Sequence, residues 1–248
     1  MTTAIVVDRP AIDRDSVGRW VWFFTASLFV ITALAGFAPR SLEILTGARR
    51  NPPLVVHVHA AIMGAWLALL FFQTLLVAMR RTAFHRTLGL AAFVLGPALL
   101  ASLIAVTLWR FGERVSLSQT EVGARVLLNQ GRAIFCFAIF FSWAMWVRKK
   151  DPDTHKRMIL LATVGPFTAA IARMSSWLPN DWPESPLSVH LYMLGLLVPA
   201  IAYDIWQRGR PHPAWLFGLA VIVPWIIVTM ILWNDPTWTA TATRLMGY

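Results

Sequence analysis

Two histidines in this 248-residue sequence lie in closely matching surroundings inside long apolar segments. His59 and His190 each follow a valine and precede a glycine by five positions, and each precedes a polar residue, Gln73 or Asp204, by fourteen positions. An imidazole inside an apolar segment is either a packing residue or a ligand for a metal or cofactor. The pattern leaves both roles open for this pair.

Three further histidines lie near the starts of apolar segments and close to basic residues. His85 and His212 each precede a proline by twelve positions, and His155 precedes one by eleven. This pattern predicts three helical hairpins of related sequence, of which the first and third match each other best. The simplest role for these three side chains is to anchor helix starts at the lipid headgroups.

The segments that carry the histidines are long enough to cross a membrane. Hydrophobic residues make up 57% of the chain and charged residues 14%, and the mean hydropathy is +0.60, which leaves too little polar surface for a soluble protein of this size. A spanning helix needs about 20 mostly apolar residues. We therefore expect an all-α integral membrane bundle of one leading helix and three hairpins. Its seven predicted spans are 20–38, 54–79, 88–109, 124–147, 158–178, 187–206 and 213–233.

The whole chain, residues 1–248, is expected to form one transmembrane domain. Its parts are a cytoplasmic tail at 1–19, the seven-helix bundle at 20–234 and an external tail at 235–248. The first apolar run is longer than the roughly 7–15-residue core of a signal peptide, so it should remain as a spanning helix. The only cysteine, Cys136, excludes a disulfide framework or a cysteine-ligated cluster built from this chain.

The formal charge of +10 is spread over the ends of the helices, which argues against a nucleic-acid partner. With seven spans, thirteen Lys and Arg residues fall on the N-terminal side of the membrane and seven on the other. The positive-inside rule then places the N-terminus in the cytoplasm and the C-terminus outside, and we expect a bacterial cytoplasmic membrane. An external acidic connection with belt tryptophans is predicted from Trp177, Asp181, Trp182 and Glu184.

Depth along the predicted helices separates the polar groups into two layers. At about 1.5 Å per residue, the outer layer holds His59, His190, Arg132 and Arg173, and the inner layer holds Gln73, Asp204, His85, His155 and His212. Ionisable groups inside a membrane are costly unless they are paired, hydrated or bound, which makes Arg132, Arg173 and Asp204 candidate site residues. The alternative for the two arginines is pairing with helix-terminal carbonyls or lipid phosphates.

A b-type haem would suit the outer layer. Two neutral imidazoles from separate helices, His59 and His190, would supply the axial ligands, and Arg132 and Arg173 would neutralise the propionates. The glycine that follows each histidine would let a flat macrocycle approach the backbone, although such glycines also allow close helix packing.

A family resemblance agrees with haem. The stretch HVHAAIMG at 57–64, then Gln73, then RRTAFHRTLG at 80–89 resembles the central hairpin of transmembrane di-haem cytochromes b of the ascorbate-reducible type. It is also similar to uncharacterised bacterial multi-pass proteins with a His-Arg-x-x-Gly turn. The cytochrome resemblance implies two haems held by histidines of four consecutive helices, and His59, His85 and His155 match by position. The fourth span lacks its histidine, so the expected centres are His59 with His190 on the outer side and His85 with His155 on the inner side.

These observations predict a haem-b protein that moves electrons across or within the bilayer. Whether it is a transmembrane oxidoreductase stays open, and a quinone or a small reductant would be its redox partner. Two alternatives remain. The chain is an accessory or assembly subunit of a larger membrane complex, or it transports a small solute or ion, with Arg132 and Arg173 as an anion site and Asp204 with Gln73 as a relay. A retinal pump is excluded, because the three lysines all lie at the loop joining spans four and five.

Overall fold

A computed structural model describes residues 14–175 and 185–248, without the side chains of residues 14 and 15. In these residues the protein is all helical, as expected. Its elements are α1 (Arg14–Leu45), α2 (Leu54–Ala78), α3 (Thr82–Leu88), η1 (Gly89–Ala91), α4 (Ala92–Ser116), α5 (Thr120–Val147), α6 (Pro152–Val164), η2 (Gly165–Phe167), α7 (Thr168–Met174), α8 (Pro186–Gly195), α9 (Val198–Arg208), α10 (Pro213–Leu232) and α11 (Pro236–Leu245).

The protein is an integral membrane protein with six or seven spanning helices in its described part. Six are long and apolar enough to cross a bilayer by themselves: Ser16–Leu45, Leu54–Ala78, Thr82–Ser116, Thr120–Val147, Pro152–Met174 and Pro213–Leu232. A seventh span is complete if α8 and α9, which are bent by 46° at their junction, cross together. That bent pair corresponds to the sixth predicted span.

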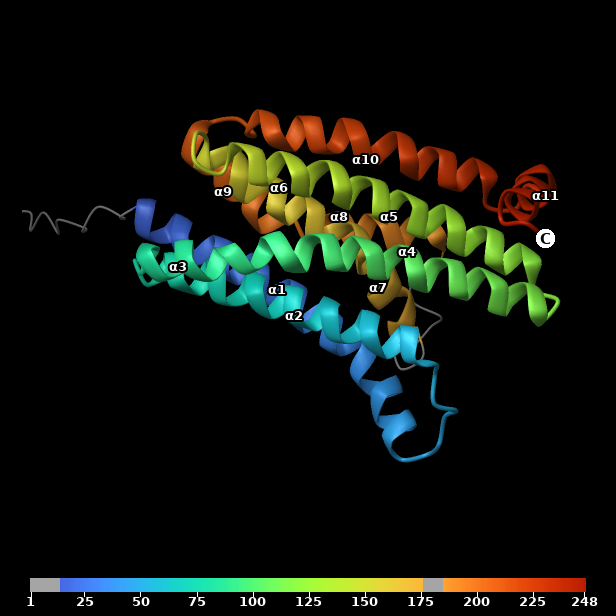
Figure 1. Cartoon of the computed structure of the whole chain (residues 1–248). Coiled ribbons are helices and arrows are strands. Elements are labelled where there is room, and N and C mark those ends of the chain that lie inside the picture. The colour runs from blue at the N-terminus through green and yellow to red at the C-terminus, as the bar shows by residue number, and fades with distance from the viewer. Residues whose placement is uncertain (1–13, 176–184) are drawn as a thin grey trace, which may run out of the picture.

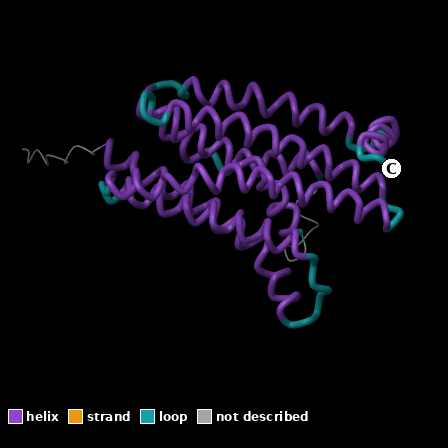
Figure 2. The backbone as a smooth tube through the Cα atoms, in the orientation of Figure 1, coloured by secondary structure: helices purple, strands orange, loops and turns teal. Residues whose placement is uncertain are grey.

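The long helices run side by side, and the turns between them gather at two ends (Figure 1). The turns at 79–81, 148–151 and 209–212 lie at one end, which we call the basic end because each contains lysine or arginine. The α4–α5 turn and α11 lie at the other end. Most connections are short, and the longest loop among the described residues, at 46–53, joins α1 to α2 (Figure 2). This alternation of ends agrees with the predicted hairpins.

The span made of α6, η2 and α7 is the central helix of the bundle. Of its most apolar part, 72% is buried inside the protein, against 22–33% for the other five helices that are each long enough to span a membrane. Leu161 and Phe167 lie in the core with Phe29 of α1, Phe137 of α5 and Trp215 of α10. The large apolar side chains that remain exposed on the outer helices suit contact with lipid.

Glycine and proline break two of the spans. The Gly165-Pro166 pair produces the 3₁₀ turn η2 between α6 and α7, because proline lacks the N–H that continues an α-helix. Pro199 occupies the first turn of α9, directly after the bend from α8. Both breaks adjoin the polar groups discussed below.

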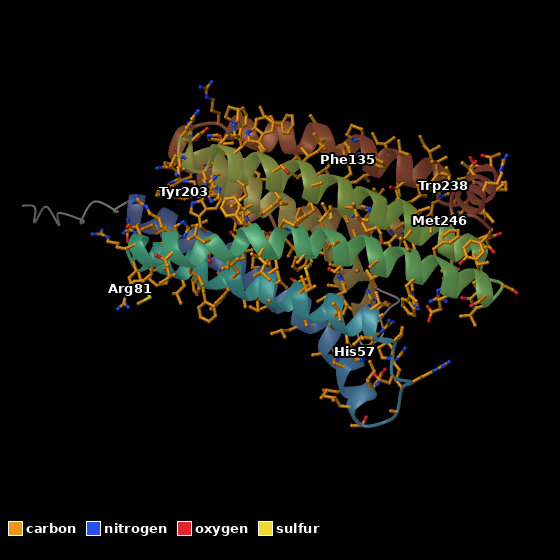
Figure 3. All side chains as sticks on the ribbon, viewed as in Figure 1. His57, Arg81, Phe135, Tyr203, Trp238 and Met246 are labelled. Carbon is orange, nitrogen blue, oxygen red and sulfur yellow. The ribbon has the colours of Figure 1, made fainter. Side chains whose placement is uncertain are left out.

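The predicted tail at 235–248 contains the helix α11, which the sequence interpretation missed. Asp235 caps it by accepting a hydrogen bond from the Thr237 N–H at 2.7 Å. The helix packs on α5, where Trp238 Nε1 donates to Ala124 O at 3.0 Å. Trp238 and Met246 lie together at the end of the molecule opposite the basic end (Figure 3). The signal was present as the sequence Asp-Pro-Thr, a typical helix start.

The acidic connection predicted from Trp177, Asp181, Trp182 and Glu184 lies outside the described residues. The side of the membrane on which either terminus lies stays a prediction.

Candidate functional site

Two histidines donate through Nδ1 to backbone carbonyl oxygens. His155 Nδ1 lies 2.9 Å from Ala144 O, and His190 Nδ1 lies 2.6 Å from Pro186 O. A carbonyl oxygen can only accept, so Nδ1 carries the proton in both neutral rings and Nε2 keeps its lone pair. Each ring is therefore in the tautomer that binds a metal through Nε2.

The rings of His85 and His59 are in the same tautomer, with the proton on Nδ1. His85 Nδ1 faces Gln73 O at a longer distance of 3.4 Å. His59 Nδ1 lies 3.1 Å from Ser102 Oγ, and the Ser102 hydroxyl already donates to Leu99 O, so the hydroxyl oxygen accepts from His59. All four predicted ligand histidines thus direct the Nδ1 proton to the protein and keep Nε2 for another partner.

His85 on α3 and His155 on α6 each follow a turn of the basic end, and with Gln73 they form what we call the His85–His155 cluster. The two rings are within electrostatic range of each other. The side-chain amide of Gln73 is buried, and both its nitrogen and its oxygen lack a hydrogen-bond partner in the described part of the chain. A Cβ added to Gly89 would lie 3.5 Å from Gln73 Nε2, so the glycine leaves room over this amide.

His212 differs from the other four. Its Nδ1 accepts a hydrogen bond from the Ala214 N–H at 3.1 Å and caps α10, so its proton is on Nε2. Burial lowers its pKa below the usual 6.5, and the charges of Arg157 and Arg208 lower it further. His212 thus caps the start of α10, and its predicted position at the lipid headgroups stays a prediction.

His59 and His190 lie in different helix neighbourhoods. His59 is on α2, which packs against α1, α3 and α4, and its ring faces α4. His190 is on α8, which packs against α7 and α10. It is fully buried, and its Nε2 has no partner within residues 14–175 and 185–248. Their joint ligation of one haem stays a prediction.

Both predicted outer arginines use backbone carbonyls. Arg132 is fully buried, and its Nη2 donates to Gly165 O at 3.0 Å, at the break between α6 and α7. Arg173 Nη1 donates to Ala169 O at 2.5 Å, and its guanidinium lies over the Phe37 ring at 4.7 Å. The alternative reading, in which arginines pair with helix carbonyls, is confirmed for these bonds.

Asp204 is paired with an arginine that sequence interpretation placed in a loop. Arg157 Nε donates to Asp204 Oδ2 at 2.7 Å, and Arg157 Nη2 donates to Asp204 Oδ1. Trp215 Nε1 also donates to Oδ2, at 2.5 Å. The side chains of Arg157 and Asp204 are 1% and 0% exposed. We call these three residues the Asp204 triad.

The sequence feature that could have predicted the role of Arg157 is the carboxylate of Asp204. A buried aspartate near a membrane boundary needs a cation at the same depth, and Arg157 is close to the start of the neighbouring hairpin. The guanidinium also lies 5.2 Å from the Trp22 ring, which stacks on Trp215 with 6.3 Å between ring centroids. This aromatic enclosure explains how a charged side chain is accommodated among the core helices.

A cavity of about 270 Å³ lies beside His190, and we call it the His190 cavity. Its walls come from α5, α7, α8 and the residues that precede α8 and follow α10. Its lining residues are Asn129, Thr168, Ala172, Ser185, Pro186, Val189, His190 and Trp233. Arg132 stands behind this wall and reaches Thr168 Oγ1 at 3.4 Å.

The described fold and polar sites define a multi-pass helical membrane protein. Comparison with known protein families, with curated proteins and with solved structures found no match. The resemblance to cytochromes b therefore stays a prediction.

Proposed function

We propose that the protein is a membrane-embedded b-type haem protein that transfers single electrons, and that His85 and His155 would hold the haem. The observation that carries the proposal is the tautomer that these two rings share. Each directs Nδ1 to a backbone carbonyl and leaves Nε2 available, and the rings come from separate helices, α3 and α6.

The donor set of the cluster fits haem. Two neutral imidazoles suit low-spin iron, and the buried, unpaired amide of Gln73 supplies a further hydrogen-bonding group. Arg86 and Arg148 act electrostatically on His85 and His155 and would bind the propionates. A bound haem would supply a one-electron iron couple.

The protein's own residues would set the properties of that site. The carbonyls of Gln73 and Ala144 orient the two rings and make Nε2 more basic. Arg148 lies over the Phe93 ring at 4.8 Å, which fixes its charge near the basic end. A cation at this position would favour the reduced state of a bound haem.

We also propose an orientation in the membrane and a redox partner. Following the positive-inside rule, the basic end faces the cytoplasm of a bacterial cell, and a quinone or a small reductant exchanges electrons with the protein. The second predicted centre, on His59 and His190, has weaker support because the two rings face different helices.

An absorption spectrum tests the proposal. Full-length protein produced with added haem and purified in detergent should show a Soret band and a dithionite-reduced difference spectrum. His85→Ala and His155→Ala should each abolish the low-spin signal in electron paramagnetic resonance. His212→Asn is the matched control, since it changes a histidine at the same end that caps a helix, and it should retain the spectrum. Folded protein without a Soret band, or with one unchanged in both alanine variants, would refute the proposal.

A second candidate function is transport of a small solute. The central span is interrupted at Gly165, and α8 and α9 bend by 46°, and transporters commonly bind substrates at such breaks. Substrate-dependent flux into proteoliposomes that contain haem-free protein would favour this function over electron transfer.

A further inference from the structure

The His190 cavity has two unpaired hydrogen-bond acceptors in its wall. His190 Nε2 and Asn129 Oδ1 are both buried and lack a partner among the residues that the structure describes. His190 Nε2 is an acceptor because Nδ1 already holds the proton. A molecule that satisfies these atoms must therefore carry a hydrogen-bond donor.

The same region holds a buried positive charge. Arg132 contacts only neutral groups in the described part of the chain: Gly165 O, Thr168 Oγ1 and Met193 Sδ. Its Nε–H has no acceptor. Arg157, the other fully buried arginine, is neutralised by Asp204. An uncompensated guanidinium among membrane helices is costly, so the missing partner should be an anion and not a water molecule alone.

The position of α8 adds to this preference. Its first turn begins at the cavity with Ser185 and Pro186, and the positive end of the helix dipole favours an anion there. The fully buried His190 ring follows one turn later and also lines the cavity. The volume of about 270 Å³ lies below the range of roughly 300–1,000 Å³ typical of drug-sized ligands.

We propose that the His190 cavity binds a small 2-hydroxycarboxylate. The carboxylate would accept from the Thr168 hydroxyl in the cavity wall, which itself accepts from Arg132, so the guanidinium balances the charge from behind the wall. The ligand hydroxyl would donate to His190 Nε2 or Asn129 Oδ1. This site goes beyond the proposed electron transfer and shares no residue with the His85–His155 cluster. It assigns His190 to ligand binding instead of haem ligation.

Calorimetric titration of the detergent-purified full chain tests the site with lactate as the probe. Lactate should bind. Acetate lacks the hydroxyl and 1,2-propanediol lacks the charge, so each should bind at least about tenfold more weakly, as expected for loss of one buried polar contact. Equal binding of lactate and acetate, or no saturable lactate binding, would overturn the proposal.

Variants separate this role from a structural one. Arg132→Met and Asn129→Leu should each weaken lactate binding at least about tenfold. Arg173→Met is the matched control, because Arg173 also donates to a helix carbonyl but its guanidinium lies over the Phe37 ring of α1, and it should bind lactate normally. Without ligand, Arg132→Met should melt no lower than the wild type, since it removes a charge that has no counterion. Undiminished lactate binding by Arg132→Met overturns the proposal.

His190→Phe distinguishes this proposal from the haem prediction. It should reduce lactate affinity to that of acetate while leaving any Soret band unchanged. Loss of haem from His190→Phe would make His190 an axial ligand and overturn the assignment. Absence of haem from the wild-type protein would refute the proposed function alone, because lactate binding is measured without it.

Discussion

The Asp204 triad should be a large single contribution to stability, and a double-mutant cycle can measure it. Replacing Asp204 with leucine leaves the Arg157 guanidinium buried without its main counterion and removes the acceptor of Trp215 Nε1. Breaking a buried ion pair costs about 3–5 kcal/mol. Asp153 lies 3.4 Å from Arg157 Nη1 and is half exposed, so it compensates part of the charge. We therefore expect a loss of about 3 kcal/mol, at the lower end of that range.

Arg157→Met should cost about as much, because it leaves a buried carboxylate with Trp215 as its remaining partner. The double variant Arg157→Met/Asp204→Leu should lose less than either single variant, about 2 kcal/mol or below, since no unpaired charge remains. The coupling energy between the two sites should then be at least about 2 kcal/mol.

Reversible unfolding in mixed micelles, followed by circular dichroism, would give these free energies. Lys156→Met is the control: Lys156 forms a 2.6 Å ion pair with Asp153 one residue from Arg157, but its side chain is 37% exposed. An exposed pair contributes little, so this variant should change the free energy of unfolding by less than about 1 kcal/mol. A double variant that loses the sum of the two single losses would show that Arg157 and Asp204 do not stabilise each other.

Two further predictions concern a helix cap and a close helix contact. Neutral His212 accepts from the Ala214 N–H and its pKa is lowered, so its contribution to stability is present above pH 6.5 and is lost as the pH falls below that value. The difference in melting temperature between the wild type and His212→Asn should therefore shrink or reverse on acidification. A difference that stays constant with pH contradicts this prediction. Gly36→Ala should destabilise the protein by roughly 2 kcal/mol, because the new Cβ would lie 2.3 Å from Ala170 O in the central span. Gly64→Ala is the control: its Cβ meets nothing within 4 Å, so it should be neutral or slightly stabilising in the same unfolding assay.

The sequence predicts the helices well because their length and apolarity are local properties. Spanning runs, basic turns and the Gly165-Pro166 break can all be read along the chain. Hydropathy does not predict the helix after Asp235, because this helix is short and of mixed polarity. Its cap residues would have predicted it.

The partners of the polar groups could not be predicted in the same way. Gln73 and Asp204 occupy equivalent positions in the sequence pattern, yet the carboxylate is bound by Arg157 while the amide has no partner. Arg157 and Asp204 are 47 residues apart, so their contact depends on which faces of α6 and α9 meet. Spacing along one helix contains no information about that choice.

Arg132 and Arg157 show why pairing must be established before a function is assigned to a buried charge. Both are fully buried and both touch the central span, Arg157 as part of α6 and Arg132 through Gly165 O. A carbonyl dipole can satisfy an N–H group, but only an opposite charge neutralises a guanidinium. Asp204 provides that charge at the basic end. Around Arg132 the described residues provide hydrogen bonds alone, and the cavity beside it is therefore where an anionic ligand would stabilise the fold as it binds.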